Sequence, residues 1–313
     1  GRRPRARERR HVRRMTKPLH LAIGAFDGVH LGHRAVLHSA REAARADGGI
    51  VGVLTYDPHP SKVLRPESSV PLIFTRAQKD DRLTEAGAQV IHHEKFDRAH
   101  ASIEAADFPK WLKQTFPQLK SLHVGSNFQY GRGRAGNGET LIAHGLSEGL
   151  SVKLVEAVHL GDETVSSSRI RQCLVTGELD LANAMLLRPY EAEGTIIGGR
   201  RLGRTIGFPT LNVAWEPELK PAYGVYAVEV IFKGEALPAV ANYGQRPTVE
   251  SGPVAPLLEA HVLRGTAPTT GDAVRVRWIR RLRAEQKFAD LSALQAQIVK
   301  DSAQAKLVLG LLS

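Results

Sequence analysis

Cysteine is almost absent from this chain of 313 residues, which contains only Cys173. One cysteine cannot form an intramolecular disulfide, and no cysteine cluster is available to hold zinc. No apolar run reaches the length that crosses a bilayer, and no apolar signal peptide precedes the first strand-like run. We therefore expect no membrane span, no export and a location in a reducing cytoplasm.

Acidic residues are scarce mainly at one end of the chain. The net charge is +11, but residues 1–14 contain eight arginines and one acid, Glu8, and so carry +7, which leaves +4 for the rest. That remainder is ordinary for an enzyme that binds polyphosphates. We interpret residues 1–16 as a basic disordered tail, or as translated sequence before a start at Met15. Aromatic residues make up 6% and form no RNA-binding motif, so nucleic-acid binding is the less favoured alternative.

Strand-like and helix-like patterns alternate through the first half of the chain. Such alternation predicts parallel strands joined by right-handed helical crossovers. We expect an α/β fold with an open, Rossmann-like parallel sheet over residues 17–186, with ligands at the carboxyl ends of its strands. The strands are expected at 19–23, 50–55, 122–125 and 152–158, with another starting at 90–91, and the helices at 33–46, 76–86 and 103–115.

The pattern changes near residues 186–190. The apolar runs become short and β-rich, with Gly and Pro between them, which predicts a small barrel over residues 187–313. Its strands are expected at 192–197, 224–232, 237–242, 257–263 and 273–279, followed by a terminal helix at 291–309.

The densest motif is GAFDGVHLGH at residues 24–33, between an expected strand and an expected helix. Gly24 and Gly28 let the backbone turn tightly and approach a ligand closely. His30 and His33 lie three residues apart at the helix start, where free N–H groups favour a phosphate, so both can face one ligand. Two imidazoles there can stabilise the charge that builds on an α-phosphate under attack. The motif therefore predicts a nucleotidyl-transfer site that uses ATP.

Two further segments offer groups for phosphates. VSSSRIR at residues 165–171 supplies hydroxyls and two arginines at an apparent helix start, although a helix cap followed by solvated arginines is the alternative. GGRRLGR at residues 198–204 is a basic, flexible segment that can reach phosphates, or a solvated turn. Each of these segments taken alone is weak evidence.

The second half carries candidate groups for a phosphoryl transfer. Thr210 and Asn212 follow a Gly-Phe-Pro turn and offer the oxygen ligands that Mg²⁺ prefers. Glu259 lies on an expected strand among apolar residues, where a partly buried carboxylate can act as a general base. An outward-facing residue paired with an arginine is an equally supported interpretation of Glu259 from the residues alone.

Further motifs continue in order along the chain. They are DPHP at 57–60, GSNFQYG at 125–131, SSSRIR at 166–171, GRTIGFPTLN at 203–212, GVYA at 224–227, NYGQRPT at 242–248, LEAH at 258–261 and LRAEQKF at 282–288. With this series the chain resembles the bacterial bifunctional riboflavin kinase/FAD synthetase family over nearly its whole length. The resemblance implies an FMN adenylyltransferase domain at 17–186 and a riboflavin kinase domain at 187–313, the latter a six-stranded antiparallel barrel with a terminal helix.

The resemblance also implies substrates and site residues. ATP, riboflavin and FMN would be substrates, FAD the final product, and Mg²⁺ the metal ion in both steps. The implied catalytic residues are His30, His33, Arg171 and Glu259. The implied nucleotide-binding residues are Gly24, Phe26, Asp27, Gly28, Gly32, Ser167, Ser168, Arg171, Gly203, Arg204 and Thr210. The implied flavin-binding residues are Pro58, His59, Asn127, Phe128, Tyr130 and Arg283, and the implied Mg²⁺ ligands are Thr210 and Asn212.

Two departures from the family pattern bear on these expectations. Ala25 replaces the Asn that is usual in the first motif, and RGTAPTTGD at 264–272 replaces a turn that helps to form the flavin side of the kinase pocket. The alternative that only the FMN adenylyltransferase is active therefore stays open. The sequence gives no indication of the oligomeric state.

Overall fold

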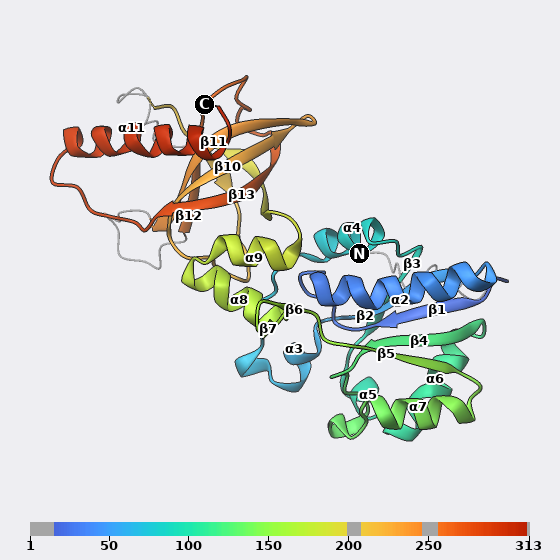
Figure 1. The fold of residues 1–313 in the computed structure, drawn as a ribbon. Coiled ribbons are helices and arrows are strands. Elements are labelled where there is room, and N and C mark those ends of the chain that lie inside the picture. Colours follow the sequence, from blue (N-terminus) through green and yellow to red (C-terminus); the bar gives the residue numbers. More distant parts are fainter. Residues whose placement is uncertain (1–15, 199–207, 246–255, 312–313) are drawn as a thin grey trace. The chain divides into compact units, whose positions relative to one another are not determined.

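The computed structural model describes residues 16–198, 208–245 and 256–311 (Figure 1). The chain divides into two compact units, Gly1–Ser167 and Ser168–Ser313, which are described in turn. The domain boundary expected at residues 186/187 follows the helix α9 (Leu179–Leu186), which packs on strands of the second unit. The arginine tail and the predicted nucleotide-binding residues Gly203 and Arg204 lie outside the described residues.

The first unit contains a five-stranded parallel sheet in the order β3-β2-β1-β4-β5. This confirms the predicted open α/β sheet. Its strands are β1 (Leu19–Ile23), β2 (Ile50–Asp57), β3 (Val90–Lys95), β4 (Leu119–Gly125) and β5 (Ser151–Val155). Its helices of eight residues or more are α2 (Leu31–Asp47), α4 (Arg76–Glu85), α6 (Phe108–Thr115) and α7 (Gly138–Ser147), and short helices lie at α3 (Pro60–Leu64) and α5 (Arg98–Ala101).

Helices cover both faces of this sheet, and the strand β2 (IVGVLTYD) has the nearly continuous apolar run that burial on both faces favours. On one face, Ala22 and Val53 pack against α2 and α4 through Leu37 and Leu83. The other face packs against α6 and α7, and its buried side chains include Leu21, Ile23, Leu122, Val124, Phe108, Leu112, Phe116 and Leu141. The two cores hold the carboxyl ends of β1, β2 and β4 side by side at one edge of the sheet.

Two predicted elements were longer than the structure allows. The helix expected from residue 103 begins at Phe108, after a 3-10 turn at Ala105–Asp107, because Pro109 lacks an N–H and fits only the first turn of a helix. The strand expected to reach residue 158 ends at Val155, where its partner β4 also ends at Gly125. The chain then forms a two-stranded hairpin of β6 (His159–Leu160) and β7 (Glu163–Thr164) that the sequence pattern did not indicate.

The second unit is a closed six-stranded antiparallel barrel, which confirms the predicted fold class. The strands run in the order β10-β11-β12-β9-β8-β13, and α11 (Leu291–Val308) follows the last of them. The strand bounds are β8 (Tyr190–Ile197), β9 (Leu211–Ala214), β10 (Gly224–Phe232), β11 (Glu235–Gln245), β12 (Pro256–Val262) and β13 (Ala273–Arg283). The strand β9 escaped prediction because its four residues are too few to show an alternating pattern.

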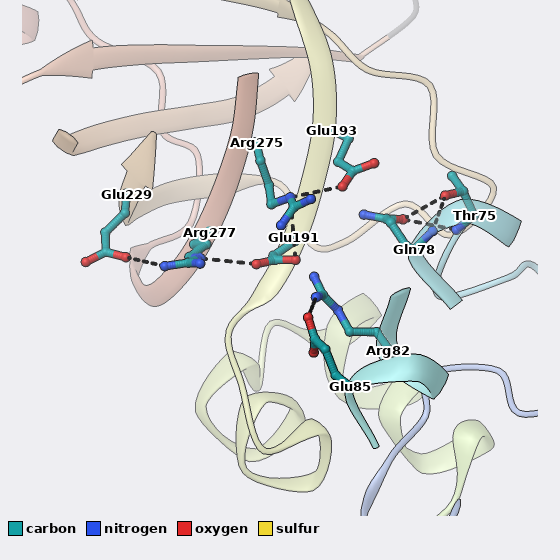
Figure 2. A network of polar contacts seen from close by, with 9 residues as sticks. All are labelled: Thr75, Gln78, Arg82, Glu85, Glu191, Glu193, Glu229, Arg275 and Arg277. Atoms are coloured by element: carbon teal, nitrogen blue, oxygen red, sulfur yellow. Dashed lines mark hydrogen bonds and ion pairs between the residues drawn. The ribbon is translucent and has the colours of Figure 1, made fainter. Parts of the chain in front are cut away.

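Aromatic rings fill the inside of the barrel. Trp278 is fully buried, with Tyr226, Tyr243 and Tyr190 at ring-centroid distances of 4.5, 5.6 and 6.1 Å. On the outside, α11 packs through Ala305 against an apolar patch of β10 and β11. Ion pairs also link neighbouring strands. Figure 2 shows Arg277 of β13 between the carboxylates of Glu191 in β8 and Glu229 in β10, at 3.1 and 3.6 Å. The barrel is therefore held by an aromatic core inside, and its outer wall carries both the apolar patch under α11 and polar groups.

Candidate active sites

The segment at residues 24–33 joins β1 to α2 in an unusual backbone conformation. Phe26, Gly28 and Val29 have φ angles of 52°, 88° and 41°, in the left-handed region that side-chain-bearing residues avoid. For Val29 this conformation is strained, because a β-branched side chain crowds the backbone there. The turn therefore depends on contacts from other parts of the chain.

Long-range hydrogen bonds hold this turn in place. The Asp27 carboxylate accepts from the backbone N–H groups of Ile73 (3.0 and 3.1 Å) and Phe74 (3.4 Å). The Ser167 hydroxyl donates to the Asp27 carbonyl at 2.7 Å. Thr55 Oγ1 donates to the carbonyl of Ala25 at 3.0 Å. Asp27 and Ser167, which the family resemblance assigns to the nucleotide, thus already stabilise the loop, and a direct nucleotide contact stays a prediction.

The two histidines meet at the N-terminus of α2. His30 is the N-cap residue and is 5% exposed, and its ring stacks on that of His33 with centroids 3.7 Å apart and planes 19° apart. Phe26 packs against His33 at 5.1 Å. A Cβ on Gly32 would lie 3.2 Å from His30 Cε1, so glycine leaves room for the imidazole. The arrangement puts two hydrogen-bonding rings where a helix N-terminus favours an anion.

The predicted flavin loop follows β4 and contains Asn127, Phe128 and Tyr130. Phe128 stacks on Tyr130 with centroids 5.9 Å apart, and Tyr130 packs on Phe108 of α6 at 5.1 Å. The Tyr130 hydroxyl lies 3.2 Å from His144 Nδ1, and burial raises the pKa of Tyr130. Asn127 is exposed and Phe128 is half-buried, so the loop presents an aromatic ring on a firmly packed base.

Pro58 and His59 follow β2 directly, and the Asp57–Pro58 peptide is cis. His59 is the N-cap of α3, and its Nδ1 accepts from the Ser61 N–H at 3.2 Å. Because β2, β1 and β4 are neighbours, this segment, the histidine turn and the flavin loop all follow carboxyl strand ends at one edge of the sheet. The predicted residues of the first unit are therefore gathered where an open α/β sheet binds ligands.

Ser168 and Arg171 lie in the helix α8 (Ser167–Thr176), which begins where the two units divide. The structure confirms that the VSSSRIR segment starts a helix. The roles of Ser168 and Arg171 at the nucleotide stay predictions.

The predicted kinase residues form a row across three strands of the barrel. Glu259 of β12 lies opposite Asn212 of β9 on one side and Asn242 of β11 on the other. The neighbours of Glu259 along the strand, Leu258 and Ala260, are buried inside the barrel, so alternation places the row on the outer wall. Glu259 is half-buried there, between two amide side chains.

Asn212 fits the predicted role of a metal ligand. Its side chain is 7% exposed, and its Oδ1 atom is buried without a hydrogen-bond partner within the described part of the chain. A buried amide oxygen of this kind costs free energy unless a ligand satisfies it, and Mg²⁺ prefers oxygen ligands. Thr210 lies two residues earlier and is exposed. Across the described ranges, no group of three or more His, Cys, Asp or Glu side chains could hold a metal ion.

Two contacts in the barrel were not anticipated. His261, two residues after Glu259, has Nδ1 2.8 Å from the carbonyl of Pro209 and so tethers the turn that precedes Thr210. Arg283, a predicted flavin-binding residue, pairs with Asp301 of α11 through Nη2 at 2.7 Å and Nε at 3.0 Å. That pair joins β13 to α11, and a flavin contact of Arg283 stays a prediction.

A chain of hydrogen bonds, buried at its centre, crosses the α2 face of the first unit's sheet. Each step spans 2.7 to 3.0 Å, and the members in order are Lys120, Asp47, His20, Ser121, His123 and Ser39. One direction of donation satisfies every step with both imidazoles neutral, from the Ser39 hydroxyl through to the Asp47 carboxylate. Burial, with smaller contributions from the charges of His20 and Lys153, lowers the pKa of His123 to about 4. These hydrogen bonds thus tie α2 to β1 and β4.

Comparisons with known proteins match both units. Residues 12–169 match the FAD synthetase family, and residues 186–309 match the riboflavin kinase family. The two matches define a class of two-module flavin-nucleotide enzymes. The bifunctional riboflavin kinase/FMN adenylyltransferase of Escherichia coli K12 is 37% identical over 293 residues, which cover 93% of each chain. The Bacillus subtilis 168 protein of the same name is 35% identical, over 91% of this chain and 90% of its own. The chain belongs to the family of bifunctional riboflavin kinases/FMN adenylyltransferases.

A solved structure shares the overall fold. It is named a macrolide-efflux protein from Streptococcus pneumoniae, is 27% identical, and aligns with a TM-score of 0.85 over 93% of this chain and 95% of its own. In the described ranges of the present chain, no helix combines the length and apolar character needed to span a membrane.

Proposed function

We propose that the barrel unit phosphorylates riboflavin to FMN with ATP, and that the α/β unit transfers AMP from a second ATP to FMN, which gives FAD and pyrophosphate. Family membership over both units supports the two activities in sequence. The observation that carries the second step is the stacked pair His30/His33 at the N-terminus of α2. We expect both steps to use Mg²⁺ and to take place in the cytoplasm.

The adenylyl transfer needs charge stabilisation more than covalent chemistry. A phosphate oxygen of FMN attacks the α-phosphorus of ATP, and the bond to the pyrophosphate oxygen breaks. His30 and His33 would donate hydrogen bonds to the α-phosphate oxygens, on which negative charge increases. Arg171 would balance the charge of the leaving pyrophosphate. Gly28 supports a phosphate site at this turn, because glycine adopts the positive φ found here and has no side chain to keep a ligand from the backbone.

The kinase step needs a base and a place for the metal. A ribityl hydroxyl attacks the γ-phosphorus of ATP, ADP leaves, and Glu259 would take the hydroxyl proton. Asn212 and Thr210 would hold Mg²⁺, which when bound neutralises charge on the ATP phosphates. The buried Asn212 oxygen and its place opposite Glu259 support both assignments.

The alternative of a single active module, with an impaired kinase, is not favoured. Residues 264–272 connect β12 to β13 without opening the barrel. The connection closes in a turn, in which Thr269 N donates to Asp272 Oδ2 at 2.8 Å and Asp272 N donates to the Thr269 carbonyl at 3.0 Å. The riboflavin kinase family match also spans this segment.

One experiment tests the whole proposal. Pure protein is incubated with riboflavin and Mg-ATP, and the flavins are separated by chromatography over time. We expect FMN to appear first and FAD to follow, with neither formed when EDTA removes the metal. A parallel reaction that starts from FMN isolates the second step. FAD from FMN without FMN from riboflavin would favour the single-module alternative, and no turnover of either substrate would reject the proposal.

A further inference from the structure

Lys79 of α4 reaches the turn that carries the two histidines, although it lies in none of the motifs. Its Nζ donates to Thr55 Oγ1 at 3.1 Å and to the Ala25 carbonyl oxygen at 3.4 Å. Thr55 Oγ1 also donates to that same carbonyl at 3.0 Å. The three groups form a closed triangle, and both oxygens that Lys79 contacts are neutral.

A capping box fixes the start of α4. Thr75 and Gln78 form it (Figure 2), in that each residue's side chain accepts from the backbone N–H of the other. Lys79 is the next residue along the helix. Just before the cap, the N–H groups of Ile73 and Phe74 bind the Asp27 carboxylate. Residues 73–79 therefore clamp the histidine turn at two points, the Asp27 side chain and the Ala25 carbonyl.

The hydrogen bonds of Lys79 and Thr55 to the Ala25 carbonyl lie at the start of the strained part of the turn. The Ala25 carbonyl belongs to the peptide that enters Phe26, the first of the residues with positive φ. A backbone oxygen has two lone pairs, and here Thr55 and Lys79 occupy both. The orientation of this peptide is thereby fixed at the start of a strained turn that ends in His30 and His33. Strained conformations persist only when their surroundings determine them.

Lys79 also brings charge to the site. Its side chain is half-buried, and burial lowers its pKa, while the charges of Asp80, Asp27 and Asp57 raise it and that of Arg76 lowers it. The ammonium form makes the stronger hydrogen bonds and adds positive charge next to a turn predicted to bind phosphates.

We propose that Lys79 is a positioning residue for adenylyl transfer: with Thr55 it fixes the Ala25 carbonyl and so orients the turn that presents His30 and His33. The inference rests on the proposed function of the α/β unit. These contacts do not depend on the side chain at residue 25, since they are made by the backbone oxygen of Ala25.

The test compares Lys79→Met and Lys79→Arg with Lys110→Met, which removes an exposed lysine of α6 in the same unit. In Lys79→Met we expect the kcat for FAD formation from FMN to fall ~30- to 100-fold, because small misplacements of catalytic groups have large effects on rate. The KM values for ATP and FMN should change less than about threefold, as expected when transition-state contacts are lost. Formation of FMN from riboflavin should be unchanged, and Lys79→Arg should recover about tenfold in kcat.

The pH profile separates positioning from a general loss of stability. The wild-type rate should fall on the alkaline side as Lys79 loses its proton, and Lys79→Arg should keep its rate there because guanidinium stays charged. A Lys79→Met kcat within about threefold of wild type, or the same alkaline fall in Lys79→Arg, would overturn the proposal. Equal loss of both activities in a Lys79→Met protein that is folded would also overturn it.

A second pair of variants guards against a Lys79→Met protein that does not fold. Thr55→Val removes the hydroxyl at nearly constant volume, and Thr55→Ser keeps it. We expect FAD formation to be about tenfold slower in Thr55→Val than in Thr55→Ser, and equal rates would contradict the proposal. Wild-type protein is assayed first, because failure to make FAD there would reject the proposed function and not the role of Lys79.

Discussion

In the α/β unit the candidate site lies in a turn between a strand and a helix, whereas in the barrel it lies along a row of paired strands. The turn is strained and is held by partners far away in the sequence, such as Ile73 and Ser167. The row at Glu259 also joins distant segments, since Asn212 and Glu259 are far apart in the sequence, but regular backbone pairing of strands sets its residues side by side. The difference teaches that one site depends on individual side-chain contacts to an irregular turn, and the other on the register of paired strands.

The sharpest test of this contrast is Glu259→Gln. Loss of the general base should lower the kcat for FMN formation by ~10²- to 10⁴-fold, while FAD formation from FMN continues at the wild-type rate. The isosteric amide leaves strand pairing intact, so the effect reports chemistry. Glu235→Gln, which changes an exposed carboxylate at the start of β11, is the matched control. Wild-type kinase turnover in Glu259→Gln would show that Glu259 is not the general base.

The reciprocal test is His30→Ala. Removing one donor at the developing phosphate charge should slow FAD formation by ~10²- to 10³-fold and let FMN accumulate. His38→Ala, which removes an exposed imidazole from the same helix, should leave both activities unchanged. If both activities fall together in His30→Ala, the two sites are not independent and the comparison fails.

A smaller effect is expected from low pH, which should reduce the free energy of unfolding of the α/β unit. His123 has its pKa lowered to about 4, and its neighbours with charge or titratable groups are His20, Lys153, Asp47 and Lys120. The unfolded chain binds a proton at this residue below about pH 6.5, and the folded chain does so only near pH 4. The free energy of unfolding should therefore fall as the pH drops from about 6.5 to 4, by at most about 1.4 kcal/mol per pH unit from this residue.

The measurement is urea unfolding followed at several pH values in wild type and in His123→Leu. The variant is expected to be less stable at pH 7, because it breaks the hydrogen-bond chain. Its stability should depend less on pH between 6.5 and 4. Parallel pH dependences in the two proteins would show that His123 is not the group responsible.

The smallest expected effect is that of removing residues 1–14. Their charge of +7 supports an RNA-binding alternative, but none of the predicted site residues lies among them. Both flavin conversions should keep wild-type kcat and KM values in the truncated protein. A loss of turnover on truncation would show that residues 1–14 contribute to activity and would reopen that alternative.

Much of the architecture follows from local pattern. The strands at 19–23 and 224–232 were predicted with the bounds that the structure has, because their apolar runs end at clear turn signals. The fold class, and the helix start that brings His30 and His33 together, were also predictable. These features depend on residues that are close in the sequence.

The supporting contacts could not be predicted in this way. Asp27 binds backbone 46 and 47 residues away, and Lys79 reaches a carbonyl 54 residues away. A lysine in the polar helix α4 and a histidine after Glu259 carry no local signal of their partners. The contacts of such side chains are set by the tertiary structure, since many surface lysines have similar neighbours in the sequence.

The alternation along β12 has a consequence for how folding errors appear. Leu258 fills the barrel and Glu259 belongs to the outer row, so a slip of one residue would exchange the two faces. The exchange would bury a carboxylate and expose a leucine at the same moment that the candidate base is lost. A barrel with this register error would therefore lose the candidate base and gain exposed apolar surface together, so the pairing that builds the site also couples its chemistry to a correctly packed core.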